Sequence, residues 1–317
     1  MLKFSFIIPV KPGGAVAALD ALRLLDAAAF PFEILIAEGK MPSRQRNLAA
    51  EQSRGDLIYF LDDDSRVVVD CLAQCAAAFE DPQVAVVGGP SLTPDYDSRL
   101  QHLFGAVLTS PFGSGAVRNR YRSVGLPRKT TEQELILCNM AFRREPFLGA
   151  AGFDERLYPN EENELLDRLA RSGYALVHLP NMAVRRSQRH SLAAFVRQMY
   201  GYGRGRAQQT LLSGPGSLTS FIPLVFVLYL VLLPLLPTVI FWKLPLIAYA
   251  TLAIIFAIVS VIATGRLETV LVACIFPVMH CSNGVGLLFG LVRGKPKSPE
   301  SAEVVIRQVK QFEQAKW

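Results

Sequence analysis

The sequence lacks a cysteine pattern typical of a disulfide framework or a zinc site. Its five cysteines, an odd number, stand at positions 71, 75, 138, 274 and 281, and these spacings match neither kind of site. A reducing cytosol is therefore the expected environment of the soluble part. The chain also lacks a recognisable signal peptide, because Met1-Leu2-Lys3 leads directly into a short strand-like run.

Glycine-rich phosphate-binding loops are absent as well. Pro12-Gly13-Gly14, in the first predicted loop, fits neither the dinucleotide fingerprint nor the P-loop. A nucleotide bound here would need side chains and a metal ion to hold its phosphates. The net charge is +6, from 33 basic and 27 acidic residues. Much of the basic excess lies near apolar segments, which favours anionic lipid headgroups or phosphorylated substrates over nucleic acid.

Hydrophobic residues make up 51% of the chain, and the last third contains three long apolar runs. At about 1.5 Å per helical residue, each run is long enough to cross a hydrocarbon core of about 30 Å. Only Trp242-Lys243 separates the first two runs, which indicates a hairpin. The runs are 218–241, 244–263 and 269–292.

Polar and basic residues in and around these runs constrain their placement. His280, Ser282 and Asn283 lie within the third run and must face protein or water. Basic residues flank both the first run, after Gly203, and the third, after Val292. If both flanks are cytosolic, the number of full crossings is even, whereas three crossings would place the tail outside, against the charge rule. Residues 303–316 are expected to form a short amphipathic helix at the membrane surface.

The first two hundred residues alternate between strand-like and helix-like segments. This alternation predicts an α/β fold with a doubly wound sheet. The runs 135–142 and 174–180 read as further strands. The expected strands before them are 4–10, 32–37, 57–61 and 84–89, and the expected helices are 15–29, 43–53 and 67–79.

Three adjacent acidic residues, Asp62, Asp63 and Asp64, directly follow the apolar run 57–61. In open α/β sheets ligands bind at the carboxyl ends of parallel strands, and adjacent carboxylates repel unless a cation lies among them. Mg²⁺ and Mn²⁺ commonly bind one or two carboxylates together with substrate phosphates. The cluster therefore favours a metal–diphosphate site. The alternative is a solvated acidic turn that caps the following helix.

A series of motifs extends this pattern over roughly residues 4 to 206. They are Ile7-Ile8-Pro9-Val10, Arg46-Asn47, Gly55-Asp56, Phe60-Leu61-Asp62-Asp63-Asp64, Asn139-Met140-Ala141-Phe142-Arg143-Arg144, Gly152-Phe153-Asp154-Glu155 and Glu161-Glu162-Asn163-Glu164-Leu165. In order and spacing the series resembles the family-two glycosyltransferases of GT-A fold. The resemblance implies inverting transfer of a sugar from a nucleotide-diphosphate donor, assisted by Mg²⁺ or Mn²⁺.

The resemblance also implies roles for individual residues. Asp64 would ligate the metal, and Asp62 would contact the metal, its bound water or the donor ribose. The histidine that many relatives carry near Arg186 is absent; His190 is a possible substitute, although a lone histidine is more often a surface or packing residue. The residues expected to bind the donor are Pro9, Val10, Glu38, Arg46, Asp62, Asp63, Asn139 and Arg204. For Arg46 the alternative is ordinary surface charge, and for Asn139 a structural hydrogen-bonding role.

Adjacent carboxylates at Glu161 and Glu162 begin the last of these motifs. Acidic residues in the first turn favour the helix dipole, which is one explanation. Inverting transfer supplies another, since a carboxylate must deprotonate the acceptor hydroxyl. The family usually has Glu-Asp here, with the second residue as the base. Glu162 is therefore the predicted catalytic base, with Glu161 as its competitor.

Two basic stretches are candidates for binding an anionic acceptor or a lipid phosphate. The first, 113–133, has few apolar anchors and is expected to be mobile; it either folds over the acceptor or is a solvated loop. The second, 195–206, mixes aromatic residues with arginines, as interface helices do. Arg204 or its neighbours would hold the donor diphosphate or anchor to headgroups. The acceptor-binding candidates are Arg118, Arg197 and Arg206.

Together these observations predict a GT-A domain over 1–212, with an interface helix at 191–212, then membrane helices over 213–293 and a basic amphipathic tail over 294–317. The predicted function is sugar transfer to a membrane-associated, polyprenyl-linked acceptor at the cytosolic face of the inner membrane. The alternatives are a processive polysaccharide synthase, which the missing Gln-x-x-Arg-Trp motif disfavours, and an inactive GT-A scaffold.

Overall fold

The computed structural model describes residues 1–237, 239–298 and 302–314. The chain divides into two compact units. The first unit comprises Met1–Pro94, Asn119–Arg186 and Lys297–Trp317, and the second comprises Asp95–Arg118 and Ser187–Pro296. The end of the chain therefore returns to the unit in which the chain begins.

The first unit is built on an eight-stranded mixed sheet of order β11-β2-β1-β3-β8-β5-β9-β7. β1 pairs in parallel with both β2 and β3, whereas β8 is antiparallel to its neighbours β3 and β5. β5 and β9 are parallel. The strands are β1 (Phe4–Val10), β2 (Phe32–Glu38), β3 (Leu57–Leu61), β5 (Val84–Gly88), β7 (Arg128–Lys129), β8 (Asn139–Arg143), β9 (Ala175–His178) and β11 (Val305–Lys310).

Burial on both faces explains why β3 is apolar without interruption. Tyr59 belongs to one hydrophobic cluster and Phe60 to the other, because successive side chains of a strand point to opposite faces of the sheet. The helices of this unit are α1 (Ala18–Leu22), α2 (Pro42–Gln52), α3 (Cys71–Ala78), α6 (Arg144–Gly149) and α7 (Glu161–Arg171). The expected layered α/β arrangement is therefore present.

Several element boundaries differ from the sequence prediction. The helix expected over 15–29 is limited to α1, and the one expected over 67–79 begins only at Cys71. Before it, Arg66–Val67 form the short strand β4, which pairs with β10 (Val184–Arg185). β10 also pairs with β6 (Ser91–Leu92). Strand pairing with distant residues overrode the local preference for helix here.

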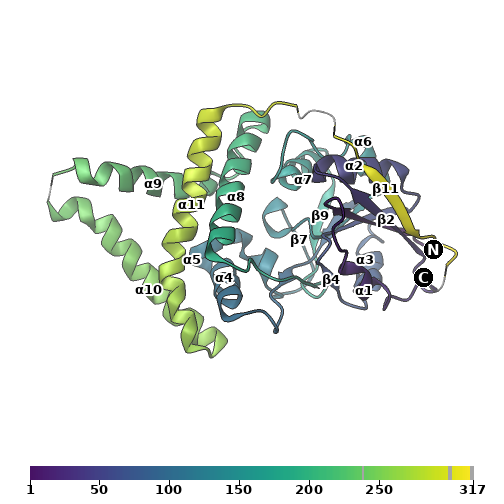
Figure 1. Cartoon of the computed structure of the whole chain (residues 1–317), viewed down its shortest axis with the longest axis horizontal. Coiled ribbons are helices and arrows are strands. Elements are labelled where there is room, and N and C mark those ends of the chain that lie inside the picture. Colours follow the sequence, from purple (N-terminus) through teal and green to yellow (C-terminus); the bar gives the residue numbers. More distant parts are fainter. Residues whose placement is uncertain (238, 299–301, 315–317) are drawn as a thin grey trace. The chain divides into compact units, whose positions relative to one another are not determined.

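The expected amphipathic helix over 303–316 is wrong within the described residues, because β11 extends the sheet. β11 pairs antiparallel with β2, with Val305 opposite Glu38, and Figure 1 shows the two strands side by side. Val304 and Ile306 pack against the core while Val305 and Arg307 are exposed. This alternation with a period of two is typical of a strand that has one buried face.

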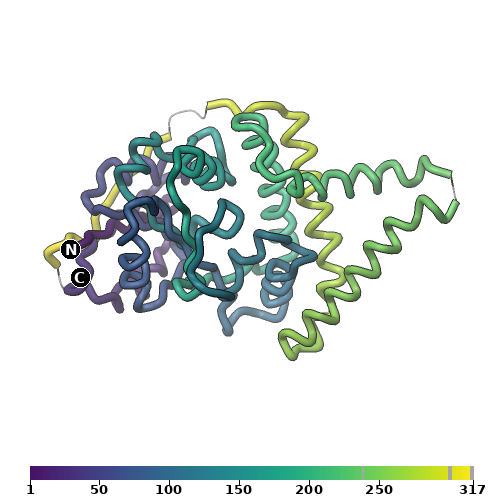
Figure 2. Tube along the Cα trace, turned by 180° about the vertical axis from the view of Figure 1, so that it is seen from behind, coloured from purple at the N-terminus to yellow at the C-terminus, as the bar shows by residue number. Residues whose placement is uncertain are grey.

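The second unit is helical. α8 (Leu192–Ser213) and α11 (Val272–Arg293) run side by side in Figures 1 and 2. Glycines permit this close approach: a side chain at Gly203 would collide with the carbonyl oxygen of Asn283, and one at Gly286 with that of Tyr200. The remaining helices are α4 (Arg99–Thr109), α5 (Pro111–Ser114), α9 (Ile222–Leu232) and α10 (Leu244–Thr264).

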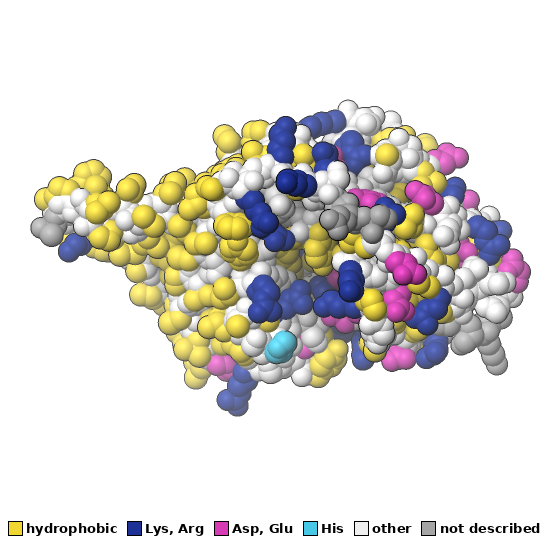
Figure 3. All heavy atoms as spheres, turned by 45° about the horizontal axis from the view of Figure 1, so that its top comes forward, with side chains coloured by type: hydrophobic (Ala, Val, Ile, Leu, Met, Phe, Trp, Pro, Cys, Tyr) yellow, Lys and Arg dark blue, Asp and Glu magenta, His cyan; other side chains and the backbone are white. Residues whose placement is uncertain are grey.

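Among the described residues, three helical segments are long and apolar enough to cross a membrane. They are Leu218–Leu235, Ile240–Thr264 and Leu267–Arg293. The first ends six residues before the end of the expected run 218–241, at a proline-containing turn. Figure 3 shows hydrophobic side chains over α9 and α10.

The polar side chains of the third apolar segment have protein partners, as expected. The Nδ1 of His280 lies 2.8 Å from the Tyr249 hydroxyl, and its Nε2 lies 3.3 Å from the carbonyl oxygen of Gly113. Asn283 donates to the carbonyl of Met199, and Ser282 donates to that of Val278.

Candidate functional site

The acidic cluster lies where β3 leaves the sheet. The main chain is held at this point because the Asp63 carbonyl accepts a bond from the Ala18 amide, and the Ser65 hydroxyl donates to the Cys138 carbonyl. Burial and the neighbouring carboxylates of Asp64 and Asp62 raise the pKa of Asp63. The three carboxylates therefore share a crowded and partly desolvated place, as the sequence predicted.

Two arginines separate the carboxylates of this site. Arg186, which follows β10, places its Nη2 3.1 Å from Asp62 Oδ2 and its Nε 2.6 Å from Asp64 Oδ1. Arg46 of α2 donates from Nη2 to Asp62 Oδ1 and from Nη1 to Glu161 Oε1, both at 3.0 Å. The order Glu161–Arg46–Asp62–Arg186–Asp64 alternates acid and base. We call these five residues the carboxylate–arginine chain.

Glu161 is the buried end of the carboxylate–arginine chain. Its side chain is 2% exposed, and within the described part of the structure its Oε2 has no hydrogen-bond partner. Burial, and then the neighbouring charge of Glu162, raise the pKa of Glu161 to about 8, although Arg46 acts in the opposite direction. Glu161 is thus mostly protonated at neutral pH.

Glu162 differs from its neighbour in access and partner. Its side chain is 13% exposed, and its Oε1 lies 3.8 Å from Arg120 Nη1. Arg120 also donates to the side chain of Asn163 and to the carbonyl of Glu132. Of the two adjacent acids, Glu162 is the one that is accessible to solvent.

The stretch 113–133 is more ordered than the sequence predicted. Short elements run through it, among them the 3₁₀ helix η1 (Gly115–Tyr121). Arg120 is 8% exposed, and Arg128 pairs with Glu134 at 2.9 Å. The expectation of a solvated basic loop is therefore wrong for Arg120 and Arg128. Arg120 is a site residue that the sequence analysis missed, because nothing in a basic run marks which arginine is buried.

The expected donor-binding residues at the ends of β1 and β2 are tied to one another. Glu38 Oε1 accepts a bond from the Gly13 amide at 3.0 Å, and its Oε2 accepts one from Arg307 at 2.9 Å. The carbonyl of Val10, which follows Pro9, accepts a bond from the side chain of Gln45 at 2.9 Å. The first loop is thus held from three elements, including β11, whose contribution the sequence analysis did not foresee.

Asn139 does not have the role expected of a donor-binding residue. Its side chain is fully buried; it accepts a bond from the Tyr59 hydroxyl at 2.6 Å and donates to the Met182 carbonyl at 2.5 Å. Because no surface of the amide is accessible, the alternative holds and Asn139 is a structural hydrogen-bonding residue. It joins β3, β8 and the segment before β10.

The remaining predicted basic residues belong to the second unit, and their part in the site stays a prediction. α8 carries three of them, and His190 precedes it. On α8, Arg197 is exposed, whereas Arg206 donates to Gln209 at 3.1 Å. The predicted residues outside the first unit are Arg118, Arg197, Arg204 and Arg206.

The carboxylate oxygens at the end of β3 supply part of the ligand set that a hard divalent cation requires. Within the described residues no group of three or more His, Cys, Asp or Glu side chains is arranged to hold a metal ion. Asp62 and Asp64 supply carboxylate oxygens, and Mg²⁺ or Mn²⁺ commonly binds one or two carboxylates and takes its other ligands from phosphates and water. Asp62 and Asp64 are therefore the residues that would hold such an ion.

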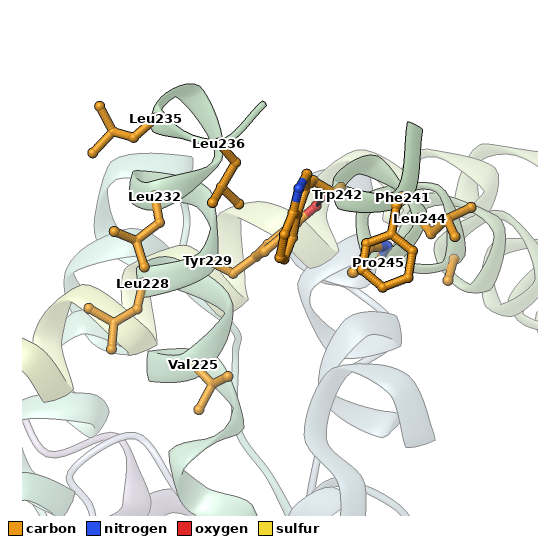
Figure 4. Close-up of a pocket in the computed structure, with 11 residues that line it drawn as sticks. Val225, Leu228, Tyr229, Leu232, Leu235, Leu236, Phe241, Trp242, Leu244 and Pro245 are labelled. Carbon is orange, nitrogen blue, oxygen red and sulfur yellow. Dashed lines mark hydrogen bonds between the residues drawn. The ribbon is translucent and has the colours of Figure 1, made fainter. Parts of the chain in front are cut away.

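The second unit contains an apolar groove with a volume of about 760 Å³ between α9 and the start of α10. Figure 4 shows Leu228 and Leu232 on one side and Phe241 and Pro245 on the other. The Tyr229 hydroxyl donates to the carbonyl of Trp242 at 2.8 Å. Because its lining is apolar, the groove offers no chemistry comparable to that of the carboxylate–arginine chain.

Comparison with protein-family models gives a match over residues 57–262 to "Glycosyl transferase family group 2". The match begins at β3, includes the carboxylate–arginine chain apart from Arg46, and covers more than half of the chain. The chain belongs to this family. The family resemblance read from the motifs is therefore confirmed.

Two known proteins are similar to this family-2 glycosyltransferase. The succinoglycan biosynthesis protein ExoA of Rhizobium meliloti (strain 1021) is 30% identical over 114 residues, which is 36% of this chain and 33% of the relative. The match thus spans about a third of the length of that curated protein. A mannosyltransferase from Pyrobaculum calidifontis, solved with GDP-Man and Mn²⁺, is 16% identical with a TM-score of 0.53, covering 91% of this chain and 86% of the other. At that identity the likeness shows the fold, which is the expected GT-A fold.

Proposed function

We propose that the protein transfers a sugar from a nucleotide-diphosphate donor to a membrane-associated acceptor, with inversion at the anomeric carbon. The observation that carries the proposal is the connection of two acidic groups in one unit. Arg46 bonds both Asp62, at the end of β3, and Glu161, which is adjacent to Glu162 on α7. An accessible carboxylate is therefore fixed relative to the acidic cluster, as a base and a leaving-group site must be.

In the proposed reaction, Glu162 accepts the proton of the acceptor hydroxyl while the hydroxyl oxygen attacks the anomeric carbon. The bond from that carbon to the diphosphate oxygen breaks, and the nucleotide diphosphate leaves with the electron pair. A divalent cation held by Asp62 and Asp64 would neutralise negative charge on the diphosphate. Arg120 Nη1, 3.8 Å from Glu162 Oε1, places a positive charge beside the proposed base.

The membrane location of the acceptor is supported by the second unit. Three of its segments are long and apolar enough to cross a bilayer, and a polyprenyl-linked acceptor would remain in the membrane during the reaction. The relation to a succinoglycan biosynthesis protein is consistent with a role in polysaccharide assembly. We place the first unit at the cytosolic face of the inner membrane, where nucleotide sugars are available.

The role of Glu162 is tested by measuring nucleotide release from a panel of nucleotide sugars with membrane extracts as acceptor. Glu162→Gln should lower kcat by about 10²-fold or more while donor binding is retained, because proton transfer contributes about 10²–10⁴-fold. Glu145→Gln, at an exposed position of α6, is the matched control and should keep full activity. Full activity of Glu162→Gln would transfer the role to Glu161. No turnover with any donor in the native protein would refute the proposed function.

A further inference from the structure

Arg186 is fixed by its backbone next to the acidic cluster. Its amide donates to the carbonyl of Leu92 at 3.1 Å, and the preceding residue Arg185 pairs with Arg66 in the antiparallel register of β10 and β4. Arg66 itself comes two residues after Asp64. The three-stranded sheet of β4, β10 and β6 therefore holds Arg186 next to the stretch of chain that carries the carboxylates.

The guanidinium of Arg186 uses oxygens that a cation would need. Asp62 has Oδ1 bonded to Arg46 and Oδ2 paired with Arg186, and Asp64 has Oδ1 paired with Arg186. A divalent ion that takes Asp62 Oδ2 and Asp64 Oδ1 together as ligands competes with Arg186 for both oxygens. Arg46 bonds Asp62 through the other oxygen, Oδ1, and also bonds the buried Glu161.

The side chains of Arg46 and Arg186 differ in their exposure to solvent. The Arg46 side chain is 5% exposed and is held by two carboxylates from different elements, whereas that of Arg186 is 20% exposed and its partner Asp64 is 46% exposed. Separating Arg186 from the partly exposed Asp64 should therefore cost less than separating Arg46 from the buried Glu161. The cost of leaving an ion unpaired rises steeply with burial.

We infer that Arg186 is the resident counter-ion of Asp62 and Asp64, and that a divalent cation binds these carboxylates by displacing the Arg186 guanidinium. The inference rests on the proposed function insofar as that function places the cation at this pair. The displaced guanidinium lies beside the cation and matches the geometry of a phosphate, which it can bind with two parallel hydrogen bonds. Cation binding would thus convert Arg186 from a carboxylate partner into a ligand of the leaving diphosphate.

The test is a titration of the purified full chain in detergent with Mn²⁺, followed by electron paramagnetic resonance, without any nucleotide. Arg186→Gln should bind Mn²⁺ about tenfold or more tightly than the native chain, because a competing cation has been removed. Arg186→Lys keeps the positive charge but loses the planar guanidinium that bonds two carboxylates, so its Mn²⁺ affinity should lie between those of the native chain and Arg186→Gln. Arg185→Gln, one residue earlier and exposed, is the matched control and should bind as the native chain does.

Equal Mn²⁺ affinity of the native chain and Arg186→Gln would overturn the inference, as would a failure of both to bind the ion. A gain that persists in Arg186→Gln/Asp64→Asn would also overturn it, since the ion would then lie elsewhere. Thermal melts exclude a misfolded variant: Mn²⁺ should raise the melting temperature of Arg186→Gln more than that of the native chain. Sugar transfer is assayed separately, so its absence would refute the proposed function, while the titration still decides the role of Arg186.

Discussion

At the scale of single residues, the site is organised by alternating charge. In the carboxylate–arginine chain each arginine lies between two acids. Partly buried ion pairs of this kind contribute little net stability, because desolvation offsets attraction, but removal of one member leaves an uncompensated charge. Arg46 and Arg186 therefore hold the acids in position more than they stabilise the fold.

The pKa of Glu161 gives a pH-dependent prediction. The folded-state pKa is about 8, above the value of about 4.3 expected in the unfolded chain. Folding therefore favours the protonated form, so the contribution of Glu161 to stability is fully present below about pH 4 and is lost as the pH rises through 8. Arg46, Glu162 and Asp62 are the charged groups that act on it.

The substitution Glu161→Gln should remove this loss of stability at rising pH. Melting temperatures of the native chain should fall between pH 6 and pH 9 relative to those of Glu161→Gln, measured in the same detergent. Glu145→Gln, exposed on α6, controls for the general effect of alkaline pH. Parallel pH profiles of the native chain and Glu161→Gln would show that Glu161 is ionised in the folded state.

The residues of the acidic cluster and the adjacent glutamates could be identified from the sequence, since strand ends and acid pairs are local patterns. Arg120 could not, because several arginines in one basic run are equivalent until packing selects one. Asn139 was placed at the site for a related reason. Its position after an apolar run is local information, whereas its partners Tyr59 and Met182 come from segments far away in sequence.

At the scale of elements, β11 is the main departure from the sequence prediction. A short amphipathic segment with Val, Ile and Lys is compatible with either an interface helix or an edge strand. The open edge of β2 decides between them, since its unpaired backbone groups offer a row of hydrogen bonds. β11 also brings Arg307 to Glu38, so the last described element helps to shape the predicted donor site.

Lys310 fixes the end of β11 and provides a test of the strand. Its ammonium group donates to the Phe32 carbonyl at 2.7 Å and lies 4.1 Å from the centre of the Phe32 ring. Lys310→Met keeps most of the length of the side chain but leaves the carbonyl unsatisfied, which should cost about 1–3 kcal/mol. Arg307→Ala, at the exposed pair with Glu38, should cost no more than about 1 kcal/mol. Thermal unfolding of both variants measures the difference, and equal losses would contradict the buried role of Lys310.

At the scale of the whole molecule, the sheet constrains the passage of the chain through a membrane. β1 and β11 belong to one sheet, so the chain before and after the apolar helices must lie on the same side of a bilayer. We therefore predict an even number of full crossings from the three segments that are long enough to cross.

Epitope tags test this topology by protease protection in sealed inverted membrane vesicles. Tags at the two ends of the chain should be equally accessible, and opposite accessibility would contradict the shared sheet. A tag after Leu236 and one after Gly265 then identify the helices that cross. If Leu218–Leu235 and Ile240–Thr264 form the crossing hairpin, only the first of these two tags is protected. If the last two segments cross, only the second is protected.

The sequence by itself determined the fold class, the acidic cluster, the glutamate pair and the apolar segments. Each of these is a contiguous pattern whose burial or chemistry can be read from neighbouring residues. The tertiary structure alone decided that Arg46 and Arg186 hold the carboxylates, that Asn139 is structural and that the tail is a strand. These depend on which distant groups share a low-dielectric space or an open sheet edge, and local pattern does not specify such partners.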